Sequence, residues 1–369
     1  MKVLYTGVYR DGTGWGNAAI DYILSLDAAD IDVVPRAVKL NNSSIDLPDR
    51  ILELESKDDS DCDVMIQHLL PHHTDYSGGY EKNIVLYASE TDNFRHSSWA
   101  SHINCMDEAW VINQQMVDCA RNSGVTVPMQ VIPHATNTDK FSQEYDNPLP
   151  QHLGEKFTFY FIGENNPRKN IRDLLVAFHS EFSASDNVSL LIKSTTPGLD
   201  SKETHDEIRN MSNKIKMDLK IFPDTTYYIE EAIVTDRFNQ EQMMGIHQHA
   251  DCFVMPSYGE AWCIPAFNAM GMGNTPIVND VGGMIDYIDD SVGFLIPNRP
   301  EPVIGMTNTF MDIYTGSENW WAVDINEMKK AMRFAYENNL QSKSEEGFNR
   351  AFDYSYHSIG LAMKEALNA

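Results

Sequence analysis

The stretch that decides the fold is Met255–Val278, which reads MPSYGEAWCIPAFNAMGMGNTPIV. Its opening apolar residues end at Pro256, which indicates a buried strand that stops there. A turn with Gly259 and Glu260 follows, and a helix begins near Pro265, because proline is favoured in the first turn of a helix. A strand, a turn and a helix in this order are typical of a parallel α/β sheet.

The same order recurs along most of the chain, where short apolar runs alternate with amphipathic segments of about 10–15 residues. The first series of predicted strands is Lys2–Thr6, Ile31–Pro35, Val64–Gln67, Ile84–Ala88, Ala109–Ile112 and Gln130–Ile132. The second series is Phe157–Ile162, Ser189–Lys193, Asp218–Phe222, Cys252–Met255, Pro276–Val278 and Phe294–Ile296. The predicted helices include Gly16–Leu26, Gln114–Asn122, Ile171–Phe182, Ser201–Lys216, Gln240–Ala250 and Pro265–Gly271.

The alternation restarts once, after the segment Ser142–Gly154, which carries two prolines, two acids and a final glycine and is typical of a linker. We therefore predict two Rossmann-like α/β domains, with residues 1–150 in the first and residues 151–351 in the second. Asp324–Leu367 is expected to be helical. Ligands of such sheets bind at the carboxyl ends of the strands, so we expect a cleft with a donor on one side and an acceptor on the other.

The composition is that of a globular protein, with 42% hydrophobic and 22% charged residues among 369. No run approaches the roughly 20 apolar residues of a membrane span, and the N-terminus lacks the apolar core of a signal peptide. Five cysteines without CxxC spacing indicate reduced thiols, so we expect a cytoplasmic protein. The net charge of −26 gives no sign of non-specific nucleic-acid or membrane binding, because such a surface repels phosphates at long range.

Two segments carry patterns with a chemical meaning. In Met255–Val278, the helix N-terminus offers backbone N–H groups to an anion, and Glu260 can accept hydrogen bonds from sugar hydroxyls, although a helix-capping Glu is the simpler alternative for this turn alone. In FIGENNPRKNIRDLLVAF (Phe161–Phe178), Arg168 and Lys169 enter a helix after a glycine turn, an arrangement that holds a diphosphate. The alternative is a solvated helix start, but the helix dipole disfavours cations there, so we favour the phosphate interpretation.

Both segments resemble glycosyltransferase family 4, also called glycosyltransferase group 1, a family of retaining enzymes with the two-domain GT-B fold. The family pattern is PSxxEGFGLPxLEAMAxGxPVV, and the residues of this chain in register with it are Pro256, Ser257, Glu260, Pro265, Ala269, Met270 and Gly273. A third match, Glu90–Phe141, looks like the family's acceptor-side stretch. The ending FDYSYHSIGLAMKEAL looks like the family's closing helix, which implies that residues from about 352 to 369 return to the first domain.

The resemblance implies sugar transfer from a nucleotide-diphosphate donor to an acceptor hydroxyl, with no metal and no other cofactor. The acceptor stays open between a glycan, a small molecule and a macromolecule. Arg168 and Lys169 would neutralise the diphosphate, Glu260 and the backbone after it would orient the sugar, and Asn268 would face the ribose. Glu90 and His134 are the candidates on the acceptor side, although a structural role for His134 is equally compatible with the sequence.

The implied catalytic residues are therefore Glu260, Lys169, Arg168, His134 and Glu90. The implied donor-binding residues are Gly14, Gly163, Lys169, Arg168, Ala261, Trp262, Cys263, Ile264, Asn268, Gly282 and Gly283. The histidines His68, His72 and His73 with Asp75 have no zinc spacing, and we expect them in a loop at the cleft edge, with His68 at the end of a strand. Trp99 and Trp262 are expected to serve packing.

The chain departs from the family pattern at several positions. Glu164 stands where the family has Arg, and Asn268 stands where it has a second Glu; Asn can bond a hydroxyl, but without charge assistance. Ala135 and Asn137 replace the usual Gly and Asp of the acceptor-side loop. These departures leave open a catalytically weak sugar-nucleotide or glycan-binding module. A Rossmann dehydrogenase is a further alternative, against which the missing GxGxxG fingerprint counts.

Overall fold

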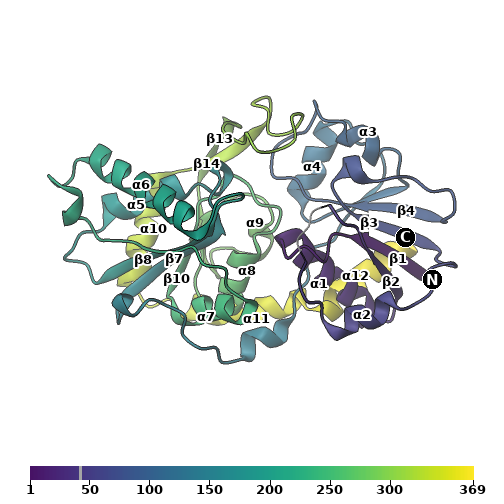
Figure 1. Ribbon diagram of the computed structural model, residues 1–369, viewed down its shortest axis with the longest axis horizontal. Helices are drawn as coiled ribbons and strands as arrows, with labels where there is room; N and C mark the ends of the chain where they lie inside the picture. The colour runs from purple at the N-terminus through teal and green to yellow at the C-terminus, as the bar shows by residue number, and fades with distance from the viewer. Residues whose placement is uncertain (41–43) are drawn as a thin grey trace. The chain divides into compact units, whose positions relative to one another are not determined.

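Two six-stranded parallel sheets, each with its own helices, organise the chain in the computed structural model, which describes residues 1–40 and 44–369 (Figure 1). Unit 1 consists of Met1–Thr138, Thr309–Glu318 and Phe352–Ala369. Unit 2 consists of Asp139–Asn308 and Asn319–Ala351. The prediction of two Rossmann-like domains is confirmed, and the C-terminal helix belongs to the first unit as the family resemblance implied.

The sheet of unit 1 has the strand order β2-β1-β3-β4-β5-β6, and all neighbouring strands are parallel. Its strands are β1 (Lys2–Gly7), β2 (Asp32–Ala37), β3 (Val64–His68), β4 (Lys82–Leu86), β5 (Glu108–Val111) and β6 (Met129–Val131). Its helices are α1 (Gly14–Ala28), α2 (Asp49–Glu55), α3 (Trp99–Ile103), α4 (Gln114–Asn122) and α12 (Tyr356–Asn368).

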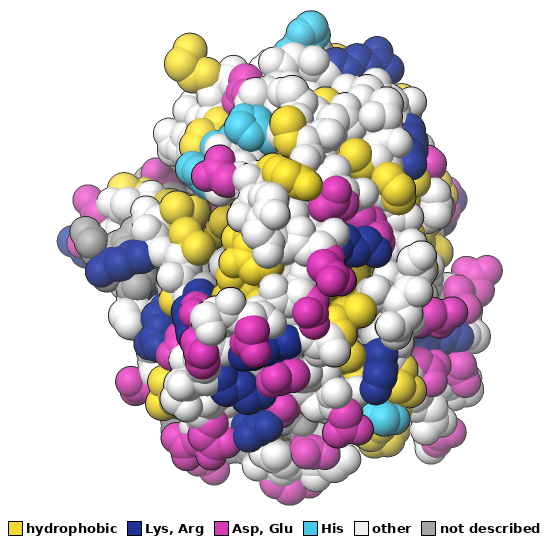
Figure 2. Space-filling model, turned by 90° about the vertical axis from the view of Figure 1, so that its right-hand side faces the viewer, with side chains coloured by type: hydrophobic (Ala, Val, Ile, Leu, Met, Phe, Trp, Pro, Cys, Tyr) yellow, Lys and Arg dark blue, Asp and Glu magenta, His cyan; other side chains and the backbone are white. Residues whose placement is uncertain are grey.

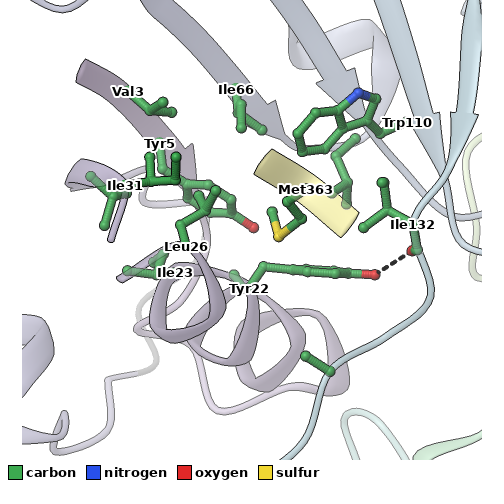
Figure 3. Packing of buried hydrophobic residues seen from close by; sticks show 14 of the residues in the cluster. Val3, Tyr5, Tyr22, Ile23, Leu26, Ile31, Ile66, Trp110, Ile132 and Met363 are labelled. Carbon is green, nitrogen blue, oxygen red and sulfur yellow. Dashed lines mark hydrogen bonds between the residues drawn. The ribbon is translucent and has the colours of Figure 1, made fainter. Parts of the chain in front are cut away.

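The core of unit 1 lies where α1 and the C-terminal α12 pack against this sheet (Figure 3). Tyr22 of α1 is fully buried, and its hydroxyl donates to the Ile132 carbonyl at 3.0 Å. Met363 of α12 is buried in the same cluster. The two helices approach so closely that a Cβ at Gly360 would lie 2.0 Å from the Ser25 carbonyl oxygen, so only glycine fits there.

The sheet of unit 2 has the order β12-β11-β10-β7-β8-β9, again with parallel neighbours. Its strands are β7 (Phe157–Glu164), β8 (Val188–Thr195), β9 (Ala232–Val234), β10 (Cys252–Met255), β11 (Ile277–Asn279) and β12 (Phe294–Ile296). An antiparallel hairpin is formed by β13 (Asn298–Pro302) and β14 (Asn319–Val323). The helices are α5 (Ile171–Glu181), α6 (Ser201–Leu219), α7 (Gln240–His249), α8 (Ile264–Gly271), α9 (Met284–Tyr287), α10 (Ile325–Glu337) and α11 (Gln341–Ala351).

One predicted strand, Asp218–Phe222, is wrong. Helix α6 starts at a capping box of Asp200 and Glu203 and runs on to Leu219, where Lys220 ends it in the left-handed conformation with φ 53°. The strand that pairs with β8 is instead β9, which begins after Glu231. The sequence analysis also missed the hairpin of β13 and β14.

Glu231 explains why α6 and β9 stay together. Its side chain is fully buried, and it contacts Arg209 and Lys216 of α6 at 3.0 Å each. Burial alone would raise the pKa of this carboxyl, but its contacts with His179, the charge of Lys216 and the hydrogen bond from Ser212 hold it down at about 2. A paired, ionised carboxylate therefore joins the helix to the edge of the sheet.

Single turns of 3₁₀-helix complete the described secondary structure; they are Pro71–His73, Thr138–Ser142, Gln151–Leu153, Pro167–Lys169, Thr225–Tyr227 and Phe352–Tyr354. Among residues 1–40 and 44–369, no helix is both long and apolar enough to cross a membrane. Figure 2 shows acidic side chains spread over the visible face with lysine and arginine between them, in keeping with the net charge of −26.

Candidate functional site

The candidate site in unit 2 lies at the carboxyl ends of the neighbouring strands β7 and β10. These strands pair in parallel, with Phe159 opposite Cys252 and Tyr160 opposite Phe253, so the loops that follow them leave the sheet at the same edge. The first loop carries Arg168 and Lys169.

Asparagines shape the loop after β7. The Asn166 side chain accepts a hydrogen bond from the Lys169 backbone N–H at 3.2 Å and thereby caps the short turn Pro167–Lys169. Asn170 takes a left-handed conformation with φ 56° and caps α5, and its amide donates to the Pro256 carbonyl at 3.1 Å. This last bond ties the loop after β7 to the loop after β10.

Further hydrogen bonds join the same two loops. The Tyr258 backbone N–H donates to the Arg168 carbonyl at 2.8 Å, and the Ser257 hydroxyl donates to the same carbonyl at 3.1 Å. The Asn279 amide at the end of β11 donates to the Ser257 carbonyl at 2.8 Å. The loops therefore form one hydrogen-bonded platform on which the charged side chains stand.

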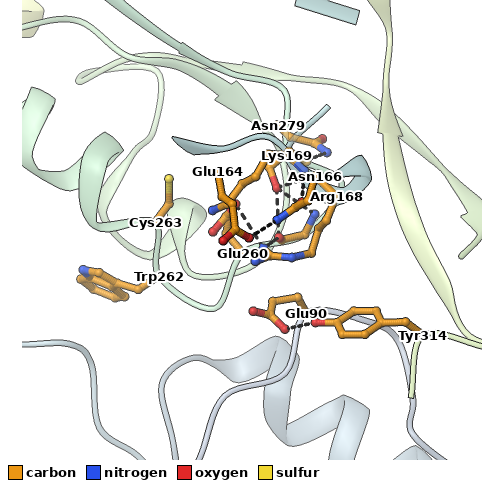
Figure 4. A network of polar contacts seen from close by, with 12 residues as sticks. Glu90, Glu164, Asn166, Arg168, Lys169, Glu260, Trp262, Cys263, Asn279 and Tyr314 are labelled. Atoms are coloured by element: carbon orange, nitrogen blue, oxygen red, sulfur yellow. Dashed lines mark hydrogen bonds and ion pairs between the residues drawn. The ribbon is translucent and has the colours of Figure 1, made fainter. Parts of the chain in front are cut away.

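Glu260 is the centre of an ion cluster on this platform (Figure 4). One of its oxygens, Oε1, lies 2.6 Å from Lys169 Nζ and 3.2 Å from Arg168 Nη1, and the same Arg168 nitrogen donates to the Gly259 carbonyl at 2.6 Å. Glu260 is only 6% exposed. Burial alone would raise the pKa of its carboxyl, but Lys169 and Arg168 outweigh burial and leave the pKa below its ordinary value.

Both cations of the cluster contact the same carboxylate, that of Glu260. Glu164, which stands where the relatives have Arg, is exposed, and its carboxylate accepts a hydrogen bond from the Asn166 amide at 2.7 Å. It forms no ion pair with either cation among the described residues. Glu164, which departs from the family pattern, therefore bonds to Asn166 instead of pairing with Arg168 or Lys169.

The turn between Glu260 and α8 is held in an uncommon backbone conformation. Cys263, the residue before α8, has φ 66°, which is rare for a residue other than glycine. Trp262 is buried, with ring centroids 4.8 Å from Tyr287 and 5.6 Å from Phe267, and its carbonyl accepts from the Tyr287 hydroxyl at 2.7 Å. The aromatic packing holds the side chain of Trp262 in the interior of unit 2.

The glycine pair Gly282–Gly283 supports this turn from behind. A Cβ at Gly282 would lie 1.9 Å from the Glu260 carbonyl oxygen, and one at Gly283 would lie 2.1 Å from the Ala261 carbonyl oxygen. The Gly283 N–H donates to the Glu260 carbonyl at 3.1 Å. Both glycines are therefore needed for close backbone contact with the turn that carries Glu260.

Asn268 lies on α8, one turn beyond its start, and is half-buried. Its side-chain oxygen Oδ1 is buried and has no hydrogen-bond partner among the described residues. An unsatisfied buried acceptor costs about 1–3 kcal/mol, so such an atom needs a reason. A ligand hydroxyl would supply the missing donor.

In unit 1, Glu90 lies in a small pocket that residues of the segment Thr309–Glu318 help to line. The Tyr314 hydroxyl donates to Glu90 Oε2 at 2.5 Å (Figure 4). Tyr314 has a left-handed backbone with φ 57°. The same segment is held by Glu318, whose buried carboxylate accepts from the Thr315 backbone N–H at 2.6 Å. Trp99 lines the pocket with its ring largely buried.

His134, the other acceptor-side candidate, is almost fully buried in unit 1. Its Nε2 lies 3.3 Å from Asp21 Oδ2, and the other oxygen of Asp21 accepts from the Tyr356 hydroxyl at 2.6 Å. The contacts join the loop after β6, α1 and α12. They give His134 a clear structural role.

The other predicted residues of unit 1 follow the carboxyl ends of its strands β1 and β3. Gly14 begins α1, where a Cβ would meet nothing within 4 Å. His68 ends β3, as predicted. Burial lowers its pKa to about 3, so its imidazole is uncharged at neutral pH. His72 accepts a hydrogen bond from Trp99 Nε1 at 2.9 Å. Within residues 1–40 and 44–369, no group of three or more His, Cys, Asp or Glu side chains could hold a metal.

The structure thus brings together Arg168, Lys169 and Glu260 in unit 2, and it places Glu90 and His134 in unit 1 with partners of their own. Sequence reasoning missed the asparagines that shape the platform and the partner Tyr314. The caps had a signal, because Asn before Pro and Asn three residues before Asp are typical helix starts. No sequence signal pointed to Tyr314, because it lies 224 residues from Glu90 and in a loop.

Comparisons with known proteins agree with this geometry. Residues 146–304 match the family model "Glycosyl transferases group 1". No curated protein matches the chain by sequence.

Several solved structures share the fold over the whole chain. Anabaena HepE in complex with UDP and glucose has 10% identity and a TM-score of 0.66, covering 100% of this chain and 99% of its own. Sucrose-phosphate synthase from Thermosynechococcus elongatus has 14% identity and a TM-score of 0.66, covering 100% and 98%. The E. coli trehalose-6-phosphate structure bound with UDP-2-fluoro glucose has 10% identity and a TM-score of 0.68, covering 100% and 99%. Residues 146–304 are thus similar to the group 1 glycosyl transferases, and the two units have the GT-B fold of these structures.

Proposed function

We propose that this chain is a retaining glycosyltransferase that moves a sugar from a nucleotide-diphosphate donor to an acceptor hydroxyl, with unit 2 as the donor-binding unit. The single observation that carries the proposal is the cluster of Arg168, Lys169 and Glu260 at the carboxyl edge of the unit 2 sheet. Within a few ångströms, the cluster has two cations that can bind an anion and one carboxylate that can bind a sugar. HepE with bound UDP and glucose and the E. coli structure with bound UDP-2-fluoro glucose support a donor of this class.

The cluster is suited to stabilise a leaving diphosphate. As the bond between sugar and phosphate breaks, negative charge grows on the phosphate oxygens, and cations placed beforehand stabilise this charge by several kcal/mol. Glu260 now holds both cations through one oxygen, Oε1. We propose that a bound diphosphate shares the cations with Glu260, whose carboxylate then accepts hydrogen bonds from the sugar hydroxyls. The backbone from Ala261 to Ile264 and the free acceptor of Asn268 complete the donor site.

On the acceptor side, Glu90 remains our candidate for binding the acceptor hydroxyl or its proton. His134 keeps a structural role at least, because Asp21 fixes it. Same-face attack, in which the leaving phosphate oxygen helps to take the acceptor's proton, would give retention, and no step in it calls for a metal. We therefore expect activity to persist in EDTA; complete loss that manganese or magnesium restores would show this part of the proposal to be wrong.

The experiment that tests the proposal is incubation of the protein with a panel of nucleotide sugars and acceptors, with products identified by mass spectrometry and the new anomeric centre by NMR. Transfer with the donor's anomeric configuration supports the proposal. A weak binding module of the same fold, which Asn268 in place of Glu favours, would bind the donor without transfer or hydrolysis. Binding of NAD in place of nucleotide sugars would indicate a dehydrogenase.

A further inference from the structure

Lys193 is a buried lysine for which the site described so far has no use. It lies near the carboxyl end of β8 and is 5% exposed. Its Nζ is 5.3 Å from the ring centroid of Phe238, which is half-buried. No carboxylate among the described residues lies within ion-pair distance of it, and no hydrogen bond satisfies its ammonium group.

Burial of the Lys193 side chain disfavours its charge, although the Nζ atom itself is not fully buried. Removing an ammonium group from water disfavours its charge, and burial accordingly lowers the pKa of Lys193, with Asp236 opposing this from a distance. The next residue, Ser194, is 2% exposed, and its hydroxyl also lacks a partner among the described residues. Successive side chains of a strand point to opposite faces of the sheet, so Ser194 does not share a ligand with Lys193. The ammonium group of Lys193 is itself a donor of three hydrogens.

The sheet order places these groups beside the donor site. Strand β7 lies between β10 and β8, and Ile162 and Gly163 of β7 pair with Lys193 and Ser194. The turn with Glu260 follows β10, on one side of β7, and Lys193 lies on the other side. Neighbouring strands are about 4.8 Å apart, so the end of β8 lies within reach of a nucleotide whose diphosphate is at the end of β7.

From this placement we propose that Lys193 binds O4 of uracil or O6 of guanine in the donor's nucleobase and so selects these bases over cytosine and adenine. The inference rests on the proposed function. An ammonium group has hydrogens to donate and no acceptor, so it fits the keto oxygen of uracil or guanine. Cytosine and adenine carry an amino group at the matching position, and two donors cannot pair. The aromatic ring of Phe238 lies next to the ammonium group, where a planar base can contact it.

The test is calorimetric titration of the full-length protein with UDP, GDP, CDP and ADP. The wild type should bind UDP or GDP at least about tenfold more tightly than CDP and ADP, since a charge-assisted bond contributes about 1.5–3 kcal/mol. Lys193→Met keeps the length of the side chain and should remove that preference. Lys193→Gln offers a donor and an acceptor, so it should bind all four diphosphates within a narrow range. Lys202→Met, an exposed lysine on α6, is the matched control and should leave every affinity unchanged.

Each outcome decides a different question. A wild type that prefers CDP or ADP, or a Lys193→Met variant that melts like the wild type and keeps its preference for keto bases, would overturn the role of Lys193 alone. A Lys193→Met variant that fails to fold leaves Lys193→Gln to decide by its base preference. A wild type that binds none of the four diphosphates would overturn the proposed function together with this inference.

Discussion

Two glutamates in the two units show how differently the same residue type can be held. Glu260 in unit 2 is 6% exposed and meets two cations through one oxygen. Glu90 in unit 1 receives a hydrogen bond from a neutral phenol, that of Tyr314. Two cations contact the first carboxylate, and a phenol hydroxyl donates a hydrogen bond to the second.

The comparison shows that two of the chain's cations lie together in unit 2. With 54 acidic and 28 basic residues, most of its surface repels an anionic substrate. Under the proposed function, the two cations that lie together after β7 bind the anionic part of the donor. Under the same proposal, the acceptor side needs no such charge, because an acceptor hydroxyl is neutral.

The largest effect on this comparison is expected from Lys169→Ala. The change removes the cation nearest to Glu260, and loss of one preorganised charge at a developing anion costs about 100- to 1,000-fold in turnover. Loss of the ion pair with the buried Glu260 should also lower the free energy of unfolding by about 1–2 kcal/mol, so turnover is compared on protein shown to be folded. Donor turnover by mass spectrometry checks this, with Lys202→Ala as the exposed control; turnover near the wild-type value would remove Lys169 from the mechanism.

A second test uses the pH dependence of stability in Glu260→Gln. The folded pKa of Glu260 is below its ordinary value, so its ion pairs stabilise the fold at neutral pH, and this contribution disappears as pH falls through that lowered pKa. We expect the variant to be about 2 kcal/mol less stable at pH 7, less than for a fully buried pair, with a difference that vanishes in acid. Denaturant titration from pH 7 down to strongly acid conditions measures it. A difference independent of pH would mean that packing, and not charge, holds Glu260.

Asn268 should produce a smaller change. If its buried acceptor receives a ribose hydroxyl, Asn268→Ala should weaken donor affinity by about 1 kcal/mol, and Asn268→Glu should tighten it by a similar amount through a charge-assisted bond. Calorimetry with the preferred donor measures both. Two unchanged affinities would take Asn268 out of the donor site.

The smallest effect is expected from Tyr314→Phe. Losing the hydrogen bond to Glu90 should lower the free energy of unfolding by about 1 kcal/mol or less, while nucleoside diphosphate affinity stays as in the wild type. Thermal unfolding and calorimetry on the same preparation separate the two quantities. A loss of diphosphate affinity as large as that in Asn268→Ala would show that Glu90 and Glu260 do not serve different ligands.

Much of the fold was predictable because parallel strands are buried on both faces and so appear as short apolar runs. The run before Pro256 and the helix after Pro265 illustrate this, since both lie where predicted. The predicted strand Asp218–Phe222 failed because its apolar residues follow a strong helix, whose capping box sets a start but no end. The end depends on Lys220 and on the buried carboxylate of Glu231, whose partners lie on another element.

The candidate site was predictable only in part, for a related physical reason. Arg168, Lys169 and Glu260 stood in local patterns, each next to a strand end, and parallel strands bring such ends to one edge. Their mutual contact at 2.6 Å and 3.2 Å required the spatial order of the strands, in which β10 lies next to β7. Tyr314, the partner of Glu90, lies by contrast in a loop without periodicity, so no sequence pattern near Glu90 indicates it.

The most direct test of the central claim is a calorimetric titration of the wild type and of the Arg168→Ala/Lys169→Ala variant with UDP and GDP. The account predicts that the wild type binds at least one diphosphate. It predicts that the variant, although it folds, loses at least about 100-fold in affinity, because each charge-assisted contact to phosphate contributes about 1.5–3 kcal/mol. Equal affinity of the folded variant and the wild type, or no binding by the wild type, would contradict the assignment of this cluster as the donor site.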